Sequence, residues 1–136
     1  MKLSQRTASK SRRILLFGPP KSGKTWLAGQ LAKEFNLIWF DLENGVDTLL
    51  KLPDEQKERV EVISLPDTRS FPIAIETMLK VIKGGPAEIC EEHGKVGCAI
   101  CKKASAPTNK IELSSLGLNT IVVVDSLTQL TNSALA

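Results

Sequence analysis

The feature that most constrains this chain is an eight-residue stretch near its start. It fits the pattern G-x-x-x-x-G-K-[ST] at every constrained position and reads Gly18-Pro19-Pro20-Lys21-Ser22-Gly23-Lys24-Thr25. An apolar run at residues 14–17 precedes it and a helical pattern follows it, which is the strand, loop and helix order that this motif requires. The stretch therefore predicts a phosphate-binding loop. The alternative is a turn rich in glycine and proline that fits the pattern by chance.

The chemistry of the loop assigns its residues to the parts of a nucleotide. Because it has no Cβ, Gly23 lets the backbone approach an anion closely at the positive end of the following helix. Pro19 and Pro20 have no N–H to donate, so the later loop residues must build the cradle. Lys24 supplies a mobile charge for the outer phosphates, and the Thr25 hydroxyl is placed to ligate Mg²⁺. We therefore expect ATP and Mg²⁺ to bind here.

Positive charge is concentrated at the start of the chain. Residues 1–33 carry eight of the 18 Lys and Arg side chains and none of the 15 acidic ones, although the net charge of the 136 residues is only +3. Residues 1–12 read as a basic, flexible leader that a nucleic acid can contact, and the alternative is a solvated terminus. Residues 13–136 have the length of one domain. No apolar run reaches the roughly 18 residues of a membrane span, so we expect a cytoplasmic protein with reduced cysteines.

The pattern of apolar residues predicts alternating strands and helices. Strands are expected at 13–17, 37–41, 59–65 and 120–124, the third as an edge strand, and helices at 24–35, 46–52 and 70–83. The first long helix is expected to bury one face that carries Leu27, Leu31 and Phe35, with Ala28 and Ala32 beside them. The last is expected to be capped by Ser70 and to bury five side chains, Phe71, Ile75, Met78, Leu79 and Ile82. This order predicts an α/β fold with a parallel sheet flanked by helices.

Two acidic residues follow predicted strands at the edge where ligands bind in open α/β sheets. Asp125 ends a strand of β-branched residues and suits the hydration shell of Mg²⁺; a helix cap is the alternative. Glu43 follows the strand at 37–41 and can orient and deprotonate an attacking water; an ordinary turn glutamate is the alternative.

Three stretches together resemble the RecA-type recombinase core, and more closely the short RecA-like ATPases of bacteriophages. They are residues 38–47 with Phe40-Asp41-Leu42-Glu43, residues 65–68, and residues 121–128 around Asp125. The resemblance implies a phosphate-loop ATPase that acts as a homo-oligomer on single-stranded DNA in recombination or replication, in the host cytoplasm if a phage encodes it. It implies that Glu43 activates the hydrolytic water, that Asp125 serves Mg²⁺, and that Asp47 lies near the adenine base.

The chain departs from the RecA-like pattern at its end. It stops at Ala136, soon after the strand that ends at Asp125, whereas RecA-like domains continue with DNA-contacting loops and a sensor strand. In that family the sensor strand lies between the strands that carry the phosphate loop and the Mg²⁺ carboxylate. Its absence leaves a gap with unpaired backbone groups, which is costly. We therefore expect a partial, C-terminally truncated core, or one that another chain completes, and little hydrolysis by residues 1–136 alone.

A segment at 84–118 interrupts the alternation of predicted strands and helices, and it contains every cysteine and the single histidine of the chain. The spacing Cys90-x2-His93-x4-Cys98-x2-Cys101 predicts a zinc knuckle, with Gly94 and Gly97 permitting the reversal. Four lysines near it are candidates for phosphate contacts: Lys95, Lys102, Lys103 and Lys110. DNA binding by this insert is one hypothesis, and a solvated loop pinned by zinc is the other.

Two further functions fit the same motifs. A nucleotide kinase also uses a phosphate loop, and some carry a zinc-pinned lid, but such an enzyme needs several arginines over the phosphates. After residue 13 the only arginines of the chain are Arg59 and Arg69. The other possibility is a nucleotide-binding remnant without turnover.

Overall fold

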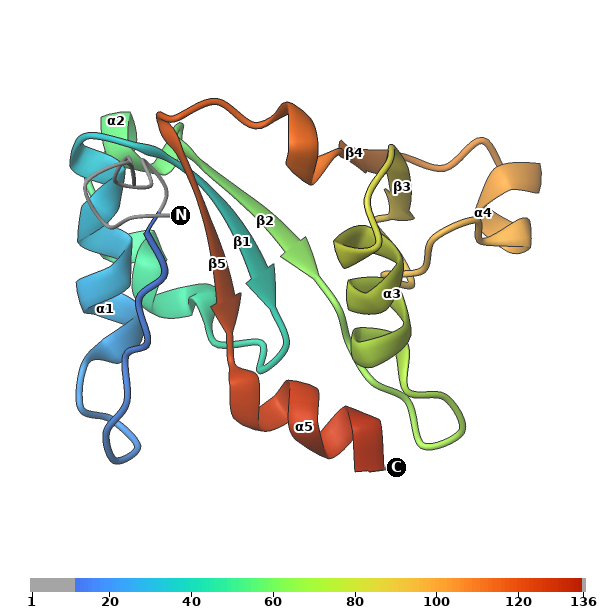
Figure 1. The fold of residues 1–136 in the computed structure, drawn as a ribbon, viewed down its shortest axis with the longest axis horizontal. Coiled ribbons are helices and arrows are strands. Elements are labelled where there is room, and N and C mark those ends of the chain that lie inside the picture. The colour runs from blue at the N-terminus through green and yellow to red at the C-terminus, as the bar shows by residue number, and fades with distance from the viewer. Residues whose placement is uncertain (1–11, 136) are drawn as a thin grey trace, which may run out of the picture.

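The computed structural model describes residues 12–135, which form a mixed α/β structure (Figure 1). Its strands are β1 (Asn36–Asp41), β2 (Val60–Ser64), β3 (Ala87–Cys90), β4 (Thr108–Ile111) and β5 (Thr120–Asp125). Its α-helices are α1 (Lys24–Gly29), α2 (Asp54–Lys57), α3 (Ile73–Ile82), α4 (Ala99–Lys103) and α5 (Leu127–Leu135). Its 3₁₀ helices are η2 (Gln30–Lys33), η3 (Val46–Lys51) and η4 (Leu113–Ser115). Of the expected leader at residues 1–12, only Arg12 lies within the described residues. Within the described range, no helix has the length and apolar character needed to cross a membrane.

The main sheet is parallel and three-stranded, in the order β2-β1-β5. Leu37 is in register with Val60 of β2 and with Ile121 of β5, and Asp41 is in register with Ser64 and Asp125. The strands expected at 37–41 and 120–124 are confirmed, and β2 is the expected edge strand. Because all three strands run the same way, their carboxyl ends meet at one edge of the sheet.

The central strand β1 is buried on both faces, as its apolar sequence predicts. Successive side chains point to opposite faces, so Trp39 and Phe40 enter different cores, and both are fully buried. Leu37 and Trp39 share one core with α1, η2 and η3, whose members also include Ala28, Ala32, Leu49 and Leu52.

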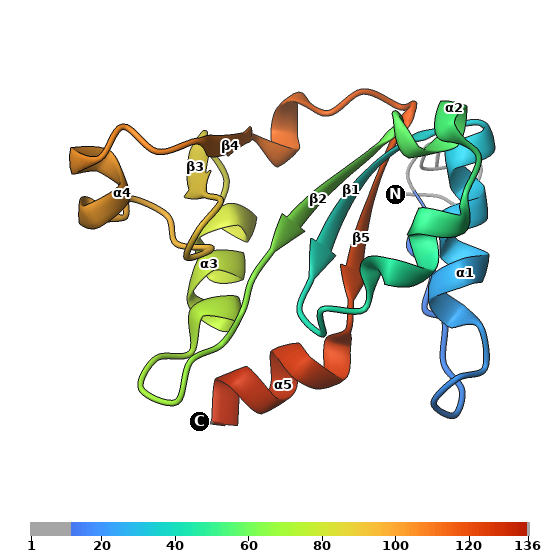
Figure 2. The same ribbon diagram turned by 180° about the vertical axis from the view of Figure 1, so that it is seen from behind.

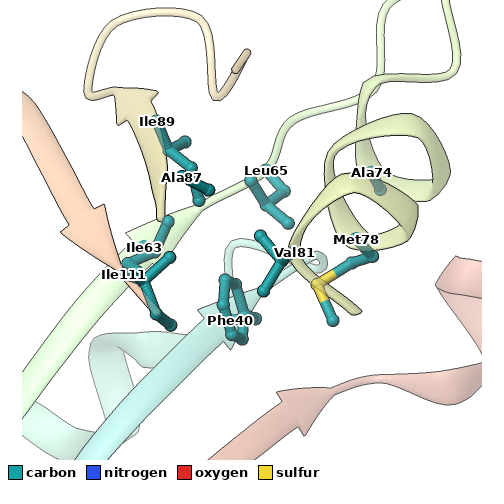
Figure 3. Packing of buried hydrophobic residues seen from close by; sticks show 9 residues of the cluster. All are labelled: Phe40, Ile63, Leu65, Ala74, Met78, Val81, Ala87, Ile89 and Ile111. Atoms are coloured by element: carbon teal, nitrogen blue, oxygen red, sulfur yellow. The ribbon is translucent and has the colours of Figure 1, made fainter. Parts of the chain in front are cut away.

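Phe40 points into the larger core, which lies between the sheet, α3 and the β3–β4 hairpin (Figure 3). Ile63 and Leu65 come from the second strand and its end, and the remaining members come from α3 and the hairpin: Ala74, Met78, Val81, Ala87, Ile89 and Ile111. The hairpin is antiparallel, with Cys90 in register with Thr108. The expected insert is therefore folded, and part of it completes the core of the domain.

The apolar run before the phosphate loop was wrongly predicted as a buried strand. Residues 13–17 have no strand pairing, and the side chains of Ile14 and Phe17 are 77% and 89% exposed. Figures 1 and 2 both draw this segment alongside α1 and apart from β5. A strand needs a neighbour for its backbone hydrogen bonds, and within residues 12–135 the order β2-β1-β5 gives this segment none.

The first helix is shorter than expected, and its buried face is made by small residues with Leu31 and Phe35 half-buried beside them. The predicted helix at 24–35 is α1 followed by the tighter η2, and Leu27 is 60% exposed. The buried positions are the small residues Ala28, Gly29 and Ala32. A Cβ on Gly29 would lie 2.5 Å from a methyl carbon of Leu49. Close packing of α1 against η3 therefore selects the small residues for the buried face.

The helix α3 begins later than predicted, and Ser70 is not its cap. The Oδ1 atom of Asp67 accepts a hydrogen bond from the N–H of Ala74 at 2.8 Å and so caps the first turn from outside the helix. Met78 is buried as expected, but Leu79 and Ile82 are 49% and 62% exposed. The remaining buried positions are Ile73, Ala74, Thr77 and Val81. Ala74 and Val81 belong to the larger core, and the Thr77 hydroxyl donates to the Gly94 carbonyl.

Candidate functional site

The four residues of the predicted zinc site lie together. One ligand atom from each of Cys90, His93, Cys98 and Cys101 falls within 4.8 Å of the others. Cys90 ends β3, His93 lies in the turn that follows, Cys98 immediately precedes α4 and Cys101 lies within it. Three thiols and one imidazole are a donor set that zinc takes in structural sites. This Cys₃His group can therefore hold a structural metal such as zinc.

The turn that carries His93 is fixed to the domain through Gly94. Its backbone has a φ of +64°, and an added Cβ would lie 2.8 Å from the carbonyl oxygen of Ser64 in β2. The Gly94 carbonyl accepts a hydrogen bond from the buried Thr77 hydroxyl of α3 at 2.7 Å. Gly97 also has a positive φ, +69°, as a sharp reversal requires. The predicted role of both glycines is confirmed, and the metal-binding turn is anchored to two elements of the core.

The ligand atoms also differ in electrostatic environment. The Nδ1 atom of His93 lies 3.1 Å from the sulfur of Cys101 and 3.8 Å from that of Cys98. A hydrogen bond from the backbone of Cys101 lowers the pKa of the Cys98 thiol to about 7, whereas burial raises the pKa of the Cys101 thiol to about 12. Only thiolates bind the metal well, so a bound cation would replace protons in this group.

The second group of predicted site residues lies where α1 meets the end of β5. The Thr25 hydroxyl donates a hydrogen bond to Oδ2 of Asp125 at 3.0 Å, although the two residues are 100 positions apart. The Lys24 ammonium group donates to the carbonyl oxygens of Gly18 at 3.0 Å and Pro19 at 2.9 Å. The structure thus brings the last residue of the motif, Thr25, to the predicted acidic residue, while Lys24 is engaged within its own loop. Pro20, Lys21, Ser22 and Gly23 lie in the exposed loop between them.

Glu43 is held near Asp125 by two residues that the sequence interpretation missed. The buried Asp41 accepts hydrogen bonds from the N–H groups of Glu43 at 3.2 Å and Gly45 at 3.1 Å, which fixes the turn after β1. The Ser126 hydroxyl donates to the Glu43 carboxylate. The signal for Asp41 was its position at the end of a wholly apolar strand, and Ser126 could be found only from the fold.

Three acidic residues therefore gather at one edge of the sheet. Burial raises the pKa of Asp125, the Thr25 hydrogen bond lowers it, and the nearby Glu43 and Asp41 raise it further. Negative charge in such a place favours a nearby cation. Asp47 is not part of this group in the structure. It lies in the first turn of η3 with an exposed side chain.

The lysines of the insert do not form one patch. Lys110 makes an ion pair with Glu88 at 3.3 Å across the β3–β4 hairpin. Lys102 and Lys103 lie at the end of α4 and are exposed. Lys95 lies over the ring of Phe71, with its ammonium nitrogen 4.6 Å from the ring centre. The four lysines proposed from the sequence to meet phosphates thus have three different environments.

Comparison with known proteins identifies no relative. No family model matches the chain, no curated protein matches it, and no solved structure matches it. The RecA-like resemblance therefore depends on the quoted residues alone, and function has to be inferred from the two groups of side chains.

The two glycines of the metal-binding turn allow a matched test of its anchoring. Both have a positive φ, but an added Cβ at Gly97 meets nothing within 4 Å. We expect Gly97→Ala to cost only the backbone penalty, roughly 1–2 kcal/mol. Gly94→Ala should cost at least about 1 kcal/mol more, because its Cβ displaces the backbone of β2. Urea unfolding of both variants with zinc present measures the difference. Equal losses would show that the turn is not packed against Ser64.

Proposed function

We propose that the chain is an ATP-binding protein of the RecA-like phosphate-loop class that binds ATP with Mg²⁺, hydrolyses it, and acts on single-stranded DNA as a homo-oligomer. The observation that carries the nucleotide part is the hydrogen bond between Thr25 and Asp125. A phosphate-loop protein needs its Ser or Thr hydroxyl and a strand-ending carboxylate on the same cation. These two side chains are in contact, and they come from the two motifs that the sequence singles out.

The surrounding residues support definite roles. Lys24 now donates to loop carbonyls, and the same ammonium group can turn to the outer phosphates of a nucleotide. Thr25 and Asp125 would hold Mg²⁺, which neutralises phosphate charge when bound. Glu43, restrained by Asp41 and Ser126, would orient and deprotonate the attacking water. The single-stranded DNA part depends on the resemblance and on Lys95, Lys102 and Lys103 of the insert, which belong to no salt bridge within residues 12–135.

The kinase alternative is less well supported. It requires arginines that stabilise the transferring phosphoryl group. Arg59 instead donates to the Lys33 carbonyl at 2.9 Å and pairs with Glu55 at 3.7 Å, so it is engaged between η2 and α2. Arg69 is exposed in the loop before α3. A protein that binds nucleotide without turnover is left as an outcome of the experiment.

The first experiment measures ATP binding and turnover, with and without single-stranded DNA. Lys24→Ala should weaken ATP binding by roughly 10- to 100-fold, because hydrogen bonds to charged groups contribute about 1.5–3 kcal/mol. Glu43→Gln should keep ATP binding and lower turnover by about 10²–10⁴-fold, the usual contribution of a general base. Lys21→Ala is the matched control in the same loop, with little expected effect on binding.

Each result of this experiment has a clear meaning. Turnover that DNA stimulates and that both substitutions remove supports the whole proposal. Tight ATP binding through Lys24 with no turnover in the unchanged chain reduces the proposal to a nucleotide-binding protein. Equal binding by wild type and Lys24→Ala contradicts it.

Asp125→Asn should separate stability from function. The raised pKa of Asp125 means that its charged form is disfavoured in the folded state, so its contribution to stability falls as the pH rises through that pKa. At pH 7 the melting temperature of the uncharged Asp125→Asn variant should therefore be no lower than that of wild type. The side-chain oxygen of its amide can still accept the hydrogen bond from Thr25. ATP with Mg²⁺ should raise the melting temperature of wild type and of the control Glu61→Gln, but not of Asp125→Asn. A lower melting temperature of the free variant would contradict this account.

We also propose that the Cys₃His group binds zinc as a structural ion. One Zn²⁺ per chain should be measured by elemental analysis, and zinc should protect all three thiols from a thiol-reactive dye. Chelation should expose the thiols and lower the melting temperature, because the hairpin that carries Cys90 also contributes Ala87, Ile89 and Ile111 to the core. Equal thiol reactivity with and without zinc would show that these residues are not ligands.

A further inference from the structure

A cavity of about 280 Å³ lies between α3 and the segment that carries the metal ligands. Phe71, which precedes α3, and Lys80, in the last turn of α3, form one side of the wall, and Lys95 and Ile100 contribute from the metal-ligand segment. The metal ligand Cys98 also lines it. The cavity is far from the phosphate loop, since α4 and α1 lie at opposite ends of the molecule in Figures 1 and 2.

The charged groups of this cavity are mainly positive. Lys80 and Lys95 line it and Glu76 is the one acidic residue in the lining. Neither lysine belongs to a salt bridge within residues 12–135. The ammonium group of Lys95 lies over the Phe71 ring, 4.6 Å from its centre, so the lysine covers one face of the ring and places a positive charge at the aromatic wall.

The apolar part of the wall suits a planar ring. The half-buried Phe71 and Val96 line the cavity, and Ile100, 69% exposed, lies at its border. A ring packed on this wall with a phosphate near the lysines is the combination that a nucleotide provides, because bases stack on aromatic side chains and phosphates attract ammonium groups. Glu76 can accept a hydrogen bond from an amino group of the base.

Positive charge continues beyond the cavity on both sides. Lys83 directly follows the end of α3, and Lys102 and Lys103 follow Ile100 on α4; all three side chains are exposed. Of the nearby acidic residues, Glu88 pairs with Lys110, whereas Glu91 and Glu92 are exposed. Lysines on either side of a base-sized cavity match the successive phosphates of a strand better than a free nucleotide.

We propose that this cavity binds one nucleotide of a single-stranded nucleic acid, with its base against Phe71 and its phosphate between Lys80 and Lys95. The proposal rests on the nucleic-acid part of the proposed function and adds to it the place of contact. Because Cys98 belongs both to the wall and to the metal group, bound zinc fixes the shape of the cavity. Removing the metal should therefore weaken the binding of the strand.

The test is fluorescence anisotropy with a labelled oligodeoxynucleotide, the full chain, Zn²⁺ and no ATP. The double variant Lys80→Gln/Lys95→Gln should lower the affinity about tenfold or more. Lys33→Gln/Lys51→Gln removes the same charge from η2 and η3, which pack with α1 in the other core, and should change it less than about threefold. Phe71→Leu keeps an apolar side chain and should lower the affinity several-fold. Equal losses in the two double variants would overturn the proposal.

Three measurements on the unchanged protein keep the test valid if a variant folds poorly. A strand of abasic residues should bind about tenfold more weakly than the normal strand, and a free deoxynucleoside monophosphate should compete only weakly. Equal binding of the normal and abasic strands, or competition by the free nucleotide at the affinity of the strand, would overturn the proposal. Photocross-linking of a strand with 5-bromodeoxyuridine should label peptides from residues 70–83 or 95–103, and labels elsewhere only would also contradict it.

The design separates this inference from the proposed ATPase. Strand binding is measured without ATP, so a chain that never turns over nucleotide can still show the cavity contact. ATP binding through Lys24 with no measurable strand affinity would overturn the cavity proposal and leave nucleotide binding in place.

Discussion

The parallel pairing of β1 with β5 is the constraint on which the rest of the structure depends. Trp39 and Phe40 enter different cores. A shift of β1 by one residue would place each of these side chains in the other core, where it does not fit the packing. Burial therefore fixes the register, and the register brings Asp41 opposite Asp125. The position of the acidic group follows from packing in the middle of the sheet rather than from any attraction among its members.

Gathering three acidic residues in one place has an electrostatic cost, and the structure offsets it with local donors. Asp41 accepts from two backbone N–H groups, Asp125 from the Thr25 hydroxyl and Glu43 from the Ser126 hydroxyl. The pKa of Asp125 is still raised by burial and by its acidic neighbours. Hydroxyl donors compensate a carboxylate only partly, whereas a divalent cation compensates several at once. The edge of the sheet therefore resembles a site whose stability improves when a cation binds.

The insert is linked to this sheet through α3. The Thr77 hydroxyl donates to the Gly94 carbonyl in the turn that carries His93. In the first turn of α3, two backbone N–H groups donate to the side chains of Asp67 and Ser133. Ser133 belongs to α5, which begins two residues after Asp125, and its hydroxyl donates to Asp67 at 3.0 Å. One helix thus contacts both the metal-binding segment and the helix that follows the acidic edge. Its position depends on these hydrogen bonds, of which the buried one from Thr77 to Gly94 is the most costly to leave unmade.

The sequence predicted the features that depend on local pattern and missed those that depend on distant partners. The strands β1 and β5 and the Cys₃His group could be predicted, because apolar runs and ligand spacing are local signals. The cap of α3 could not, since Asp67 lies outside the helix and the pattern favoured Ser70. The run at 13–17 shows the same limit most clearly. Its apolar residues fit a buried strand, yet a strand exists only when another backbone pairs with it. In the described sheet β5 is the last strand and does not pair with this run, so Ile14 and Phe17 are exposed although their sequence favours a buried strand.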